Sequence, residues 1–203
     1  MEITTVLCDV GGVVLTNGWD HDSRRLAAEK FGLDWDEFCR RHDPLMPDFD
    51  CGRLTLDEYL GKAVFYRPRA FSAEEFEAFM YAQSRAYPEA RAVVSQLAAT
   101  GRYFMTTLNN EPLELNRYRI ARFGLRELFT LFFSSCFLGA RKPDPAVYRT
   151  ALDVMQRTPE ECLFIDDRAG NIEAARALGM RTIHYLDAGQ LRDQLKRHGI
   201  ALP

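Results

Sequence analysis

The segment Thr4–Val14, TTVLCDVGGVV, constrains the fold more than any other part of this chain. It opens as an apolar run typical of a buried strand, reaches one acid, Asp9, and turns through Gly11 and Gly12. A buried strand that delivers a carboxylate into a glycine turn places that group at the open edge of a sheet, where α/β folds bind ligands. An acid before glycines also occurs in ordinary turns, so Asp9 alone decides nothing.

Two later segments end in the same way. Cys162–Asp167, CLFIDD, is an apolar run that closes on two acids, and Arg102–Asn110, RYFMTTLNN, closes on two amides. Between them the loop Gly139–Pro145 holds a lysine directly before a proline. Because the carboxyl ends of parallel strands meet at one edge of a sheet, we expect the polar residues of these segments to lie together. They are Asp9, Asn109, Lys142 and Asp167.

The order of elements indicates a split α/β core with a helical insertion. Strands are predicted at Thr4–Cys8, Tyr103–Leu108, Leu131–Ser134, Cys162–Ile165 and Thr182–Tyr185. Core helices are predicted near Pro88–Ala99, Glu114–Phe123, Pro145–Gln156, Asn171–Leu178 and Gln190–His198. Apolar spacing of three and four residues predicts inserted helices at Asp22–Phe31, Asp34–Arg41, Thr55–Val64 and Ser72–Ser84. We therefore predict a doubly wound parallel sheet from residues 1–15 and 88–203, with an α-helical cap over residues 16–87.

Composition narrows the class of protein. The 203 residues are 47% hydrophobic and 27% charged, which suffices for one buried core and a small insertion. A net charge of −3 offers no electrostatic case for nucleic acid or an anionic membrane as a partner. The N-terminal residues enter a strand without a basic or long apolar stretch, so we expect a cytoplasmic protein. The five cysteines lack paired spacing and are expected to be reduced, with Cys8 in the core.

Two segments carry long, specific motifs. Gly139–Tyr148 has the pattern GxRKPDPxxY, and Phe164–Met180 has the pattern FIDDxxxNxxAAxxLGM. With Asp9 and Asn109 placed as they are, the whole chain resembles the haloacid dehalogenase-like (HAD) hydrolase superfamily, in particular its phosphatase-like and epoxide-hydrolase N-terminal-domain-like members. The resemblance implies a Rossmann-like core with an inserted cap. It also implies a Mg²⁺-dependent phosphatase that acts on a small phosphorylated metabolite through an aspartyl-phosphate.

The resemblance assigns phosphate chemistry to four residues. Asp9 is the expected nucleophile, and Lys142 is expected to neutralise both Asp9 and the phosphate by its point charge. Asn109 and Asn110 are the expected phosphate contacts, through the side-chain amide and the following backbone N–H. Asn109 stands where the family usually has Ser or Thr, which is a mild departure because an amide also donates hydrogen bonds.

The resemblance also implies a magnesium site. Asp9, the backbone carbonyl of Gly11, and Asp167 are the expected oxygen ligands, and Asp166 is expected to orient them. In the alternative, either of the paired acids caps the following helix instead. The four histidines lack metal-ligand spacing, which argues against zinc.

Gly11 marks the main departure from the family pattern. Phosphatases of the family have a second aspartate there, which protonates the leaving group and later activates water; losing such a group costs ~10²–10⁴ in rate. If Gly11 adopts positive φ, a side chain there would also be strained. His21, in the linker to the cap, is a candidate replacement. The alternative is that Asp20 or Asp22 caps the first cap helix and His21 lies in solvent.

Two other functions remain open on the sequence. One is a catalytically impaired protein that binds a phosphate ligand or a protein partner on the same scaffold. The other is a metal-independent dehalogenase-type hydrolase, which the paired acids Asp166 and Asp167 disfavour because they resemble a retained Mg²⁺ site. Candidates for substrate specificity, with packing inside the cap as the alternative, are Trp19, Met46, Phe49, Arg53 and Tyr59.

Overall fold

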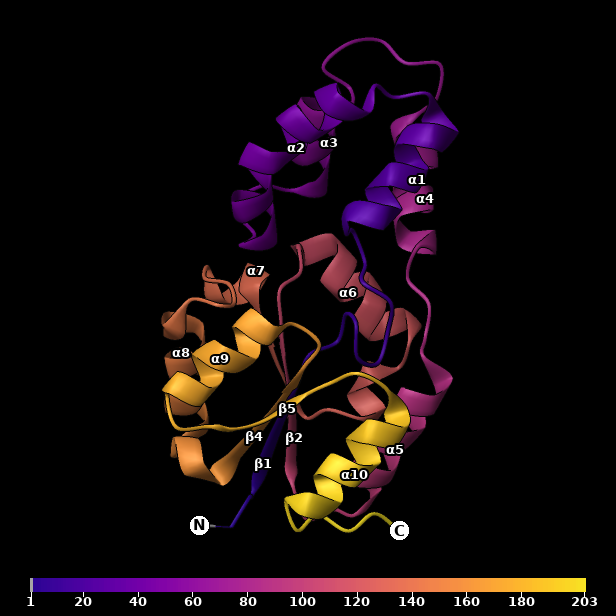
Figure 1. Ribbon diagram of the computed structural model, residues 1–203. Helices are drawn as coiled ribbons and strands as arrows, with labels where there is room; N and C mark the ends of the chain where they lie inside the picture. The colour runs from indigo at the N-terminus through magenta and orange to yellow at the C-terminus, as the bar shows by residue number, and fades with distance from the viewer. Residues whose placement is uncertain (1) are drawn as a thin grey trace.

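The computed structural model describes residues 2–203 as a sheet-based core with a helical cap at one end (Figure 1). Within these residues the core holds five parallel strands in the order β3-β2-β1-β4-β5. Their bounds are β1 Thr5–Cys8, β2 Phe104–Asn109, β3 Leu131–Ser134, β4 Cys162–Asp166 and β5 Arg181–His184. The predicted doubly wound parallel sheet is confirmed. Because β1 pairs with both β2 and β4, the loops after these three strands leave the same edge side by side.

Helices cover both faces of the sheet. One face packs against α5 (Pro88–Ala99), α6 (Leu113–Arg122) and α10 (Ala188–Arg197), and the other against α8 (Pro145–Met155) and α9 (Ala169–Ala177). The alternation along β1 follows from strand geometry, since Leu7 joins the α8–α9 side and Cys8 the α5–α10 side. Both are fully buried, so Cys8 lies in the core as predicted. The sequence does not predict three short helices: η1 (Leu125–Glu127), α7 (Ser135–Leu138) and η2 (Pro159–Glu161).

The cap has its own apolar core. It consists of α1 (His21–Phe31), α2 (Trp35–Asp50), α3 (Leu56–Ala63) and α4 (Ala73–Ala82), and it stands over the carboxyl edge of the sheet (Figure 1). Capping boxes begin α3 at Thr55 and α4 at Ser72, where each hydroxyl accepts a backbone N–H three residues on. The exact division into residues 1–15 with 88–203 and 16–87 stays a prediction. Among the helices of residues 2–203, none combines the length and apolar character needed to cross a membrane.

The predicted end of one cap helix is wrong. The sequence predicts a helix over Asp34–Arg41, whereas α2 continues to Asp50 and contains two prolines. The apolar face of the helix extends beyond these prolines, where Phe49 stacks on Tyr59 with ring centroids 4.2 Å apart. Packing in the cap therefore outweighs the roughly 3 kcal/mol that an interior proline costs a helix. The additional turns bring Asp50, the last residue of α2, to the boundary with the core.

Candidate active site

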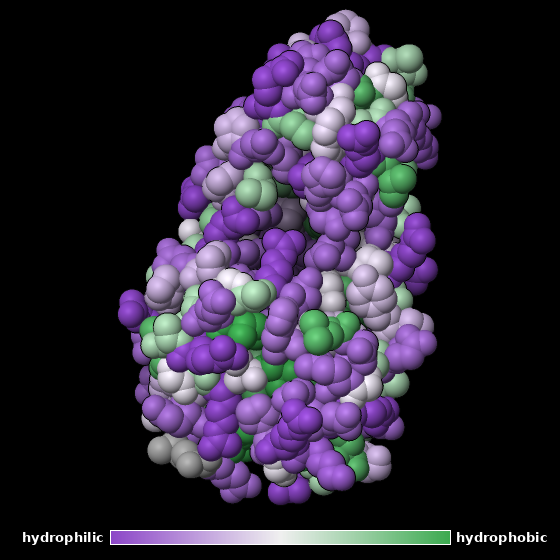
Figure 2. All heavy atoms as spheres, in the orientation of Figure 1, coloured by the Kyte–Doolittle hydropathy of each residue, from purple (hydrophilic) through white to green (hydrophobic). Residues whose placement is uncertain are grey.

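A cavity of about 300 Å³ lies between the cap and the core. Figure 2 shows a hollow there, surrounded mainly by hydrophilic residues. The core lines the cavity with predicted site residues from three loops: Asp9, Gly11, Asn109, Asn110 and Lys142. The structure thus brings together polar groups that are more than 130 residues apart in the sequence. Asp166 and Asp167 lie next to this group, with Asp9 as the shared neighbour.

Lys142 links two of the predicted acids. Its Nζ lies 3.0 Å from Oδ2 of Asp9 and 2.6 Å from Oδ2 of Asp166. Only 2% of Lys142 is exposed, and burial alone would disfavour its ammonium form. The two carboxylates outweigh that effect and raise the pKa of Lys142. The lysine is therefore a fixed positive charge beside Asp9 at neutral pH.

The two asparagines at the end of β2 support their neighbours. Asn110 donates from Nδ2 to the carbonyl of Lys142 and accepts the Lys142 N–H, both at 2.8 Å, which fixes the lysine's backbone. Asn109 donates from Nδ2 to Oε2 of Glu111 and Oδ1 of Asn116, each at 3.3 Å. These amide groups have protein partners in the structure, and their predicted contact with phosphate stays a prediction.

Three carboxylates form a cluster that suits a metal ion. Asp9, Asp166 and Asp167 each offer an oxygen, and these oxygens lie within 4.8 Å of one another. Burial, and to a lesser extent Asp166, raises the pKa of Asp9 against the opposing charge of Lys142. Burial followed by Asp166 likewise raises the pKa of Asp167. One ammonium thus leaves an excess of negative charge, and an all-oxygen donor set of this kind fits a hard cation such as Mg²⁺.

The paired acids differ in their surroundings. Asp166 is fully buried, accepts Asn171 Nδ2 on both oxygens at 3.0 Å, and accepts the Arg168 N–H at 2.8 Å. It therefore fixes the start of α9 as well as Lys142. Asp167 is half-buried, and within residues 2–203 its Oδ1 has no hydrogen-bond partner. A buried oxygen without a partner is costly unless another group satisfies it, so Asp167 is the acid better placed to ligate a cation.

The glycine turn after β1 makes room for Asp167. Gly12 has φ of 79°, and a Cβ there would lie 2.2 Å from Oδ2 of Asp167. Glycine is required at this position for both reasons. Gly11 does not share the positive φ, so the condition for backbone strain from a side chain at residue 11 is not met. A Cβ on Gly11 would lie 3.1 Å from Oδ1 of Asn17 and 3.7 Å from Nη1 of Arg119.

A second buried ion pair borders the cavity. Arg119 on α6 contacts Oε1 of Glu111 through Nη1, and both residues are at most 3% exposed. Nη2 of Arg119 donates to the carbonyl of Thr16 at 2.6 Å, so the pair holds the linker to the cap against the core beside Gly11. Sequence reasoning missed this pair because its members are eight residues apart, with a proline between them, and follow no helical spacing.

The linker follows the alternative in which an aspartate caps the first cap helix and His21 lies mostly in solvent. Asp20 caps α1 by accepting the backbone N–H of Ser23 at 2.9 Å. His21 lines the cavity, but its side chain is 68% exposed. It contacts Asp22 at 3.2 Å and packs edge-on against Trp35.

The cap wall of the cavity is partly aromatic. Trp19, Met46 and Phe49, three of the specificity candidates, line it. Trp19 donates from Nε1 to the hydroxyl of Tyr59, which lies behind the wall and also bonds Nδ1 of His42. The fifth candidate, Arg53, does not line the cavity; it pairs with Asp48 at 2.7 Å and donates to the carbonyl of Gly139.

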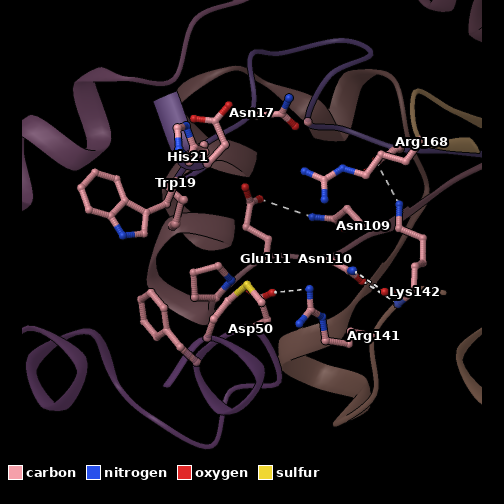
Figure 3. A pocket seen from close by; sticks show the side chains of 18 of the residues that line it. Asn17, Trp19, His21, Asp50, Asn109, Asn110, Glu111, Arg141, Lys142 and Arg168 are labelled. Atoms are coloured by element: carbon pink, nitrogen blue, oxygen red, sulfur yellow. Dashed lines mark hydrogen bonds and ion pairs between the residues drawn. The ribbon is translucent and has the colours of Figure 1, made fainter. Parts of the chain in front are cut away.

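Figure 3 shows how further charged residues face the cavity. Asp50 from the cap lies opposite Arg141 from the core, with 3.4 Å between their charged atoms. Arg168, at the start of α9, extends its guanidinium toward the same space. Sequence reasoning missed Asp50 because the predicted helix stops before it. Arg141 and Arg168 directly adjoin the predicted residues Lys142 and Asp167, and this adjacency is the signal that the sequence offers for them.

Two known proteins are similar to this chain in sequence. Phosphatase MT3486 of Mycobacterium tuberculosis (strain CDC 1551 / Oshkosh) is 28% identical over 207 residues, covering 97% of this chain and 94% of that protein. Bifunctional epoxide hydrolase 2 of Rattus norvegicus is 38% identical over 80 residues, which are 39% of this chain and 14% of that protein. The chain therefore spans nearly all of the first relative and a small part of the second.

Solved structures show the same fold. The HAD family enzyme BT-2542 of Bacteroides thetaiotaomicron matches with a TM-score of 0.82 over 97% of this chain and 100% of that chain, at 20% identity. The same enzyme in complex with magnesium and inorganic phosphate matches with a TM-score of 0.76 over 92% and 96%, at 19% identity. The family model of haloacid dehalogenase-like hydrolases matches residues 3–179. The protein thus belongs to the haloacid dehalogenase-like hydrolase family and is a hydrolase.

Proposed function

We propose that this hydrolase is a Mg²⁺-dependent phosphatase that acts on a small phosphorylated metabolite through a phospho-Asp9 intermediate. The observation that carries the proposal is the setting of Asp9, whose carboxylate lies 3.0 Å from Nζ of Lys142 and beside the two further acids. A carboxylate that attacks a phosphate meets charge repulsion, so catalysis depends on positioning and on neutralising cations. Lys142 supplies one such charge in a fixed position.

The remaining residues divide between metal binding and support. Asp9, Asp167 and the backbone carbonyl of Gly11 would hold Mg²⁺, which would supply a second positive charge for neutralising the phosphate. The unpartnered Oδ1 of Asp167 supports this assignment. Asp166 would position Lys142 and Asp167, since its oxygens are already used by Lys142, Asn171 and the Arg168 N–H.

Three further observations support a phosphorylated small molecule as the substrate. The cavity of about 300 Å³ is the size of a small-ligand site, and Arg141, Lys142 and Arg168 give its core side a positive lining. The mycobacterial relative is named a phosphatase, and the Bacteroides enzyme holds magnesium and inorganic phosphate. A metal-independent dehalogenase would leave the carboxylate cluster without a purpose, and we therefore rank that alternative lower.

The test is a phosphate-release assay over a panel of phosphorylated metabolites and one aryl phosphate. We expect turnover with Mg²⁺, loss of turnover in EDTA, and loss in Asp9→Asn, which keeps the size of the side chain but removes the nucleophile. Asp193→Asn, an exposed acid on α10, is the matched control and should leave the rate unchanged. Activity that survives in EDTA or in Asp9→Asn would refute the proposal.

A further inference from the structure

Because Gly11 has no carboxyl group, the residue that protonates the leaving group and activates water has to be found elsewhere in the site. In-line displacement at phosphorus places the leaving oxygen opposite the attacking atom. Asp9 attacks from the edge of the sheet, so a group that faces the cavity from the cap side can reach the leaving oxygen. The same group then activates the water that attacks the phospho-enzyme from that side. Candidates are the titratable residues that line the cavity outside the predicted phosphate and metal set.

Most of these candidates are already committed elsewhere. Asp20 caps α1, and Glu111 uses its two oxygens on Arg119 and Asn109. Burial lowers the pKa of His42 to about 3, so this histidine does not carry a proton to deliver at neutral pH. His21 is mostly exposed and contacts its own neighbour, Asp22.

Asp50 is the group that remains. Its side chain is 16% exposed and lines the cavity from the cap side, at the end of α2. Oδ2 of Asp50 forms an ion pair with Nη2 of Arg141 at 3.4 Å, a separation beyond the usual 2.7–3.2 Å of an N–H···O hydrogen bond. Burial raises the pKa of Asp50 to about 6; Arg141, Arg168 and Arg24 oppose the rise, and Glu111 adds to it. A general acid and base works best with a pKa near the operating pH.

The cap segment that carries Asp50 is anchored to the core. The backbone carbonyl of Asp50 accepts the hydroxyl of Ser135 at 2.5 Å. Gly52 packs so closely that a Cβ there would lie 2.4 Å from the carbonyl oxygen of Cys136. Arg53 adds a hydrogen bond of 3.1 Å to the carbonyl of Gly139. These contacts hold Asp50 in a fixed position at the boundary that the cavity spans.

We propose that Asp50 is the general acid and base of the reaction and supplies from the cap the carboxyl group that residue 11 lacks. The inference rests on the proposed phosphatase function. In the first step an oxygen of Asp9 bonds to phosphorus, the bond to the leaving oxygen breaks, and the proton of Asp50 passes to that oxygen. In the second step Asp50 takes a proton from water, whose oxygen bonds to phosphorus as the bond to Asp9 breaks. Phosphate leaves, and Asp50 is protonated again.

The test compares Asp50→Asn with Asp48→Asn in the full chain with Mg²⁺. Asp48 lies on the same helix with a side chain that is 54% exposed, and it pairs with Arg53 outside the cavity. Rapid mixing with an aryl phosphate separates the two steps, because a phenolate leaves readily without protonation. We expect Asp50→Asn to keep the burst of phenolate but to lose about 10²-fold in the steady-state rate. The rate of hydrolysis of an alkyl phosphate should fall by at least as much. In a plot of steady-state rate against pH, the change in slope near pH 6 should disappear.

The outcomes separate this inference from the proposed function. An unchanged steady-state rate in Asp50→Asn, with an active wild-type protein, would overturn the role of Asp50 alone. Loss of the burst together with the steady-state rate would also overturn it, since Asp50 would then act by holding the site together. A wild-type protein without any turnover would refute the proposed function, and this inference with it. Equal losses in Asp48→Asn would assign the effect to general electrostatics of the cap and likewise overturn the role.

Discussion

Replacing Lys142 with methionine tests how the site holds its charges. The substitution removes the ammonium but keeps an unbranched chain of similar length. Lys142 and Asp166 have side chains that are at most 1% exposed, Asp9 has one that is 10% exposed, and the two contacts are 3.0 and 2.6 Å. Removing one partner of such a buried pair leaves uncompensated charge and costs about 3–5 kcal/mol of unfolding free energy. We expect a loss in that range for Lys142→Met at pH 7.5 in EDTA.

The assay is urea unfolding followed by circular dichroism, with Lys196→Met as the control. Lys196 is an exposed lysine on α10, and surface substitutions of this kind change stability by about 0.5 kcal/mol at most. Added Mg²⁺ should recover part of the loss in Lys142→Met, because a cation beside Asp9 replaces part of the missing charge. A loss below about 1 kcal/mol, or one equal to that of the control, would refute the claim that this lysine neutralises the acids.

Three further predictions address the metal, the cap and residue 11. Asp167→Asn should weaken Mg²⁺ binding in calorimetry at least ~10-fold, as expected for loss of a carboxylate ligand; unchanged affinity would remove Asp167 from the metal site. His42 takes up a proton near its ordinary pKa of 6.5 in the unfolded chain, but burial lowers its pKa to about 3 in the folded protein. The free energy of unfolding should therefore fall as the pH falls from 6.5 toward 3. His42→Gln should reduce the slope of unfolding free energy against pH by up to about 1.4 kcal/mol per pH unit. Identical slopes in urea titrations would contradict the burial of a neutral histidine. Gly11→Asp, placed in the Asp50→Asn variant, should restore part of the slow phase because Gly11 has no positive φ; a folded double variant with no gain would show that an acid at residue 11 cannot serve.

Local patterns account for most of what the sequence predicts. The capping boxes at Thr55 and Ser72 depend on residues three apart, so they are readable without the fold. The positions of Asp9 and Lys142 at the site can also be predicted from the sequence, because the carboxyl ends of parallel strands meet at one edge of the sheet. Asp166 adds a contact to Lys142 that the sequence pattern does not indicate.

Contacts between segments that are distant in the sequence account for the features that the sequence does not predict. Asp50 reaches the cavity only because packing carries α2 past two prolines, against the local helix propensity. Arg119 pairs with Glu111 through tertiary folding, and no local spacing indicates it. The amide of Asn110 holds the backbone of Lys142, a use that sequence alone does not distinguish from the predicted phosphate binding.

The central claim is that Asp9 carries the phosphoryl group during turnover. The most direct measurement is acid quenching of the wild-type protein during turnover of an aryl phosphate with Mg²⁺, followed by mass spectrometry of its peptides. The account predicts one added phosphoryl group on the peptide that contains Asp9, removed by hydroxylamine and absent from Asp9→Asn. Turnover without any labelled peptide, or with the label on another residue, would contradict it.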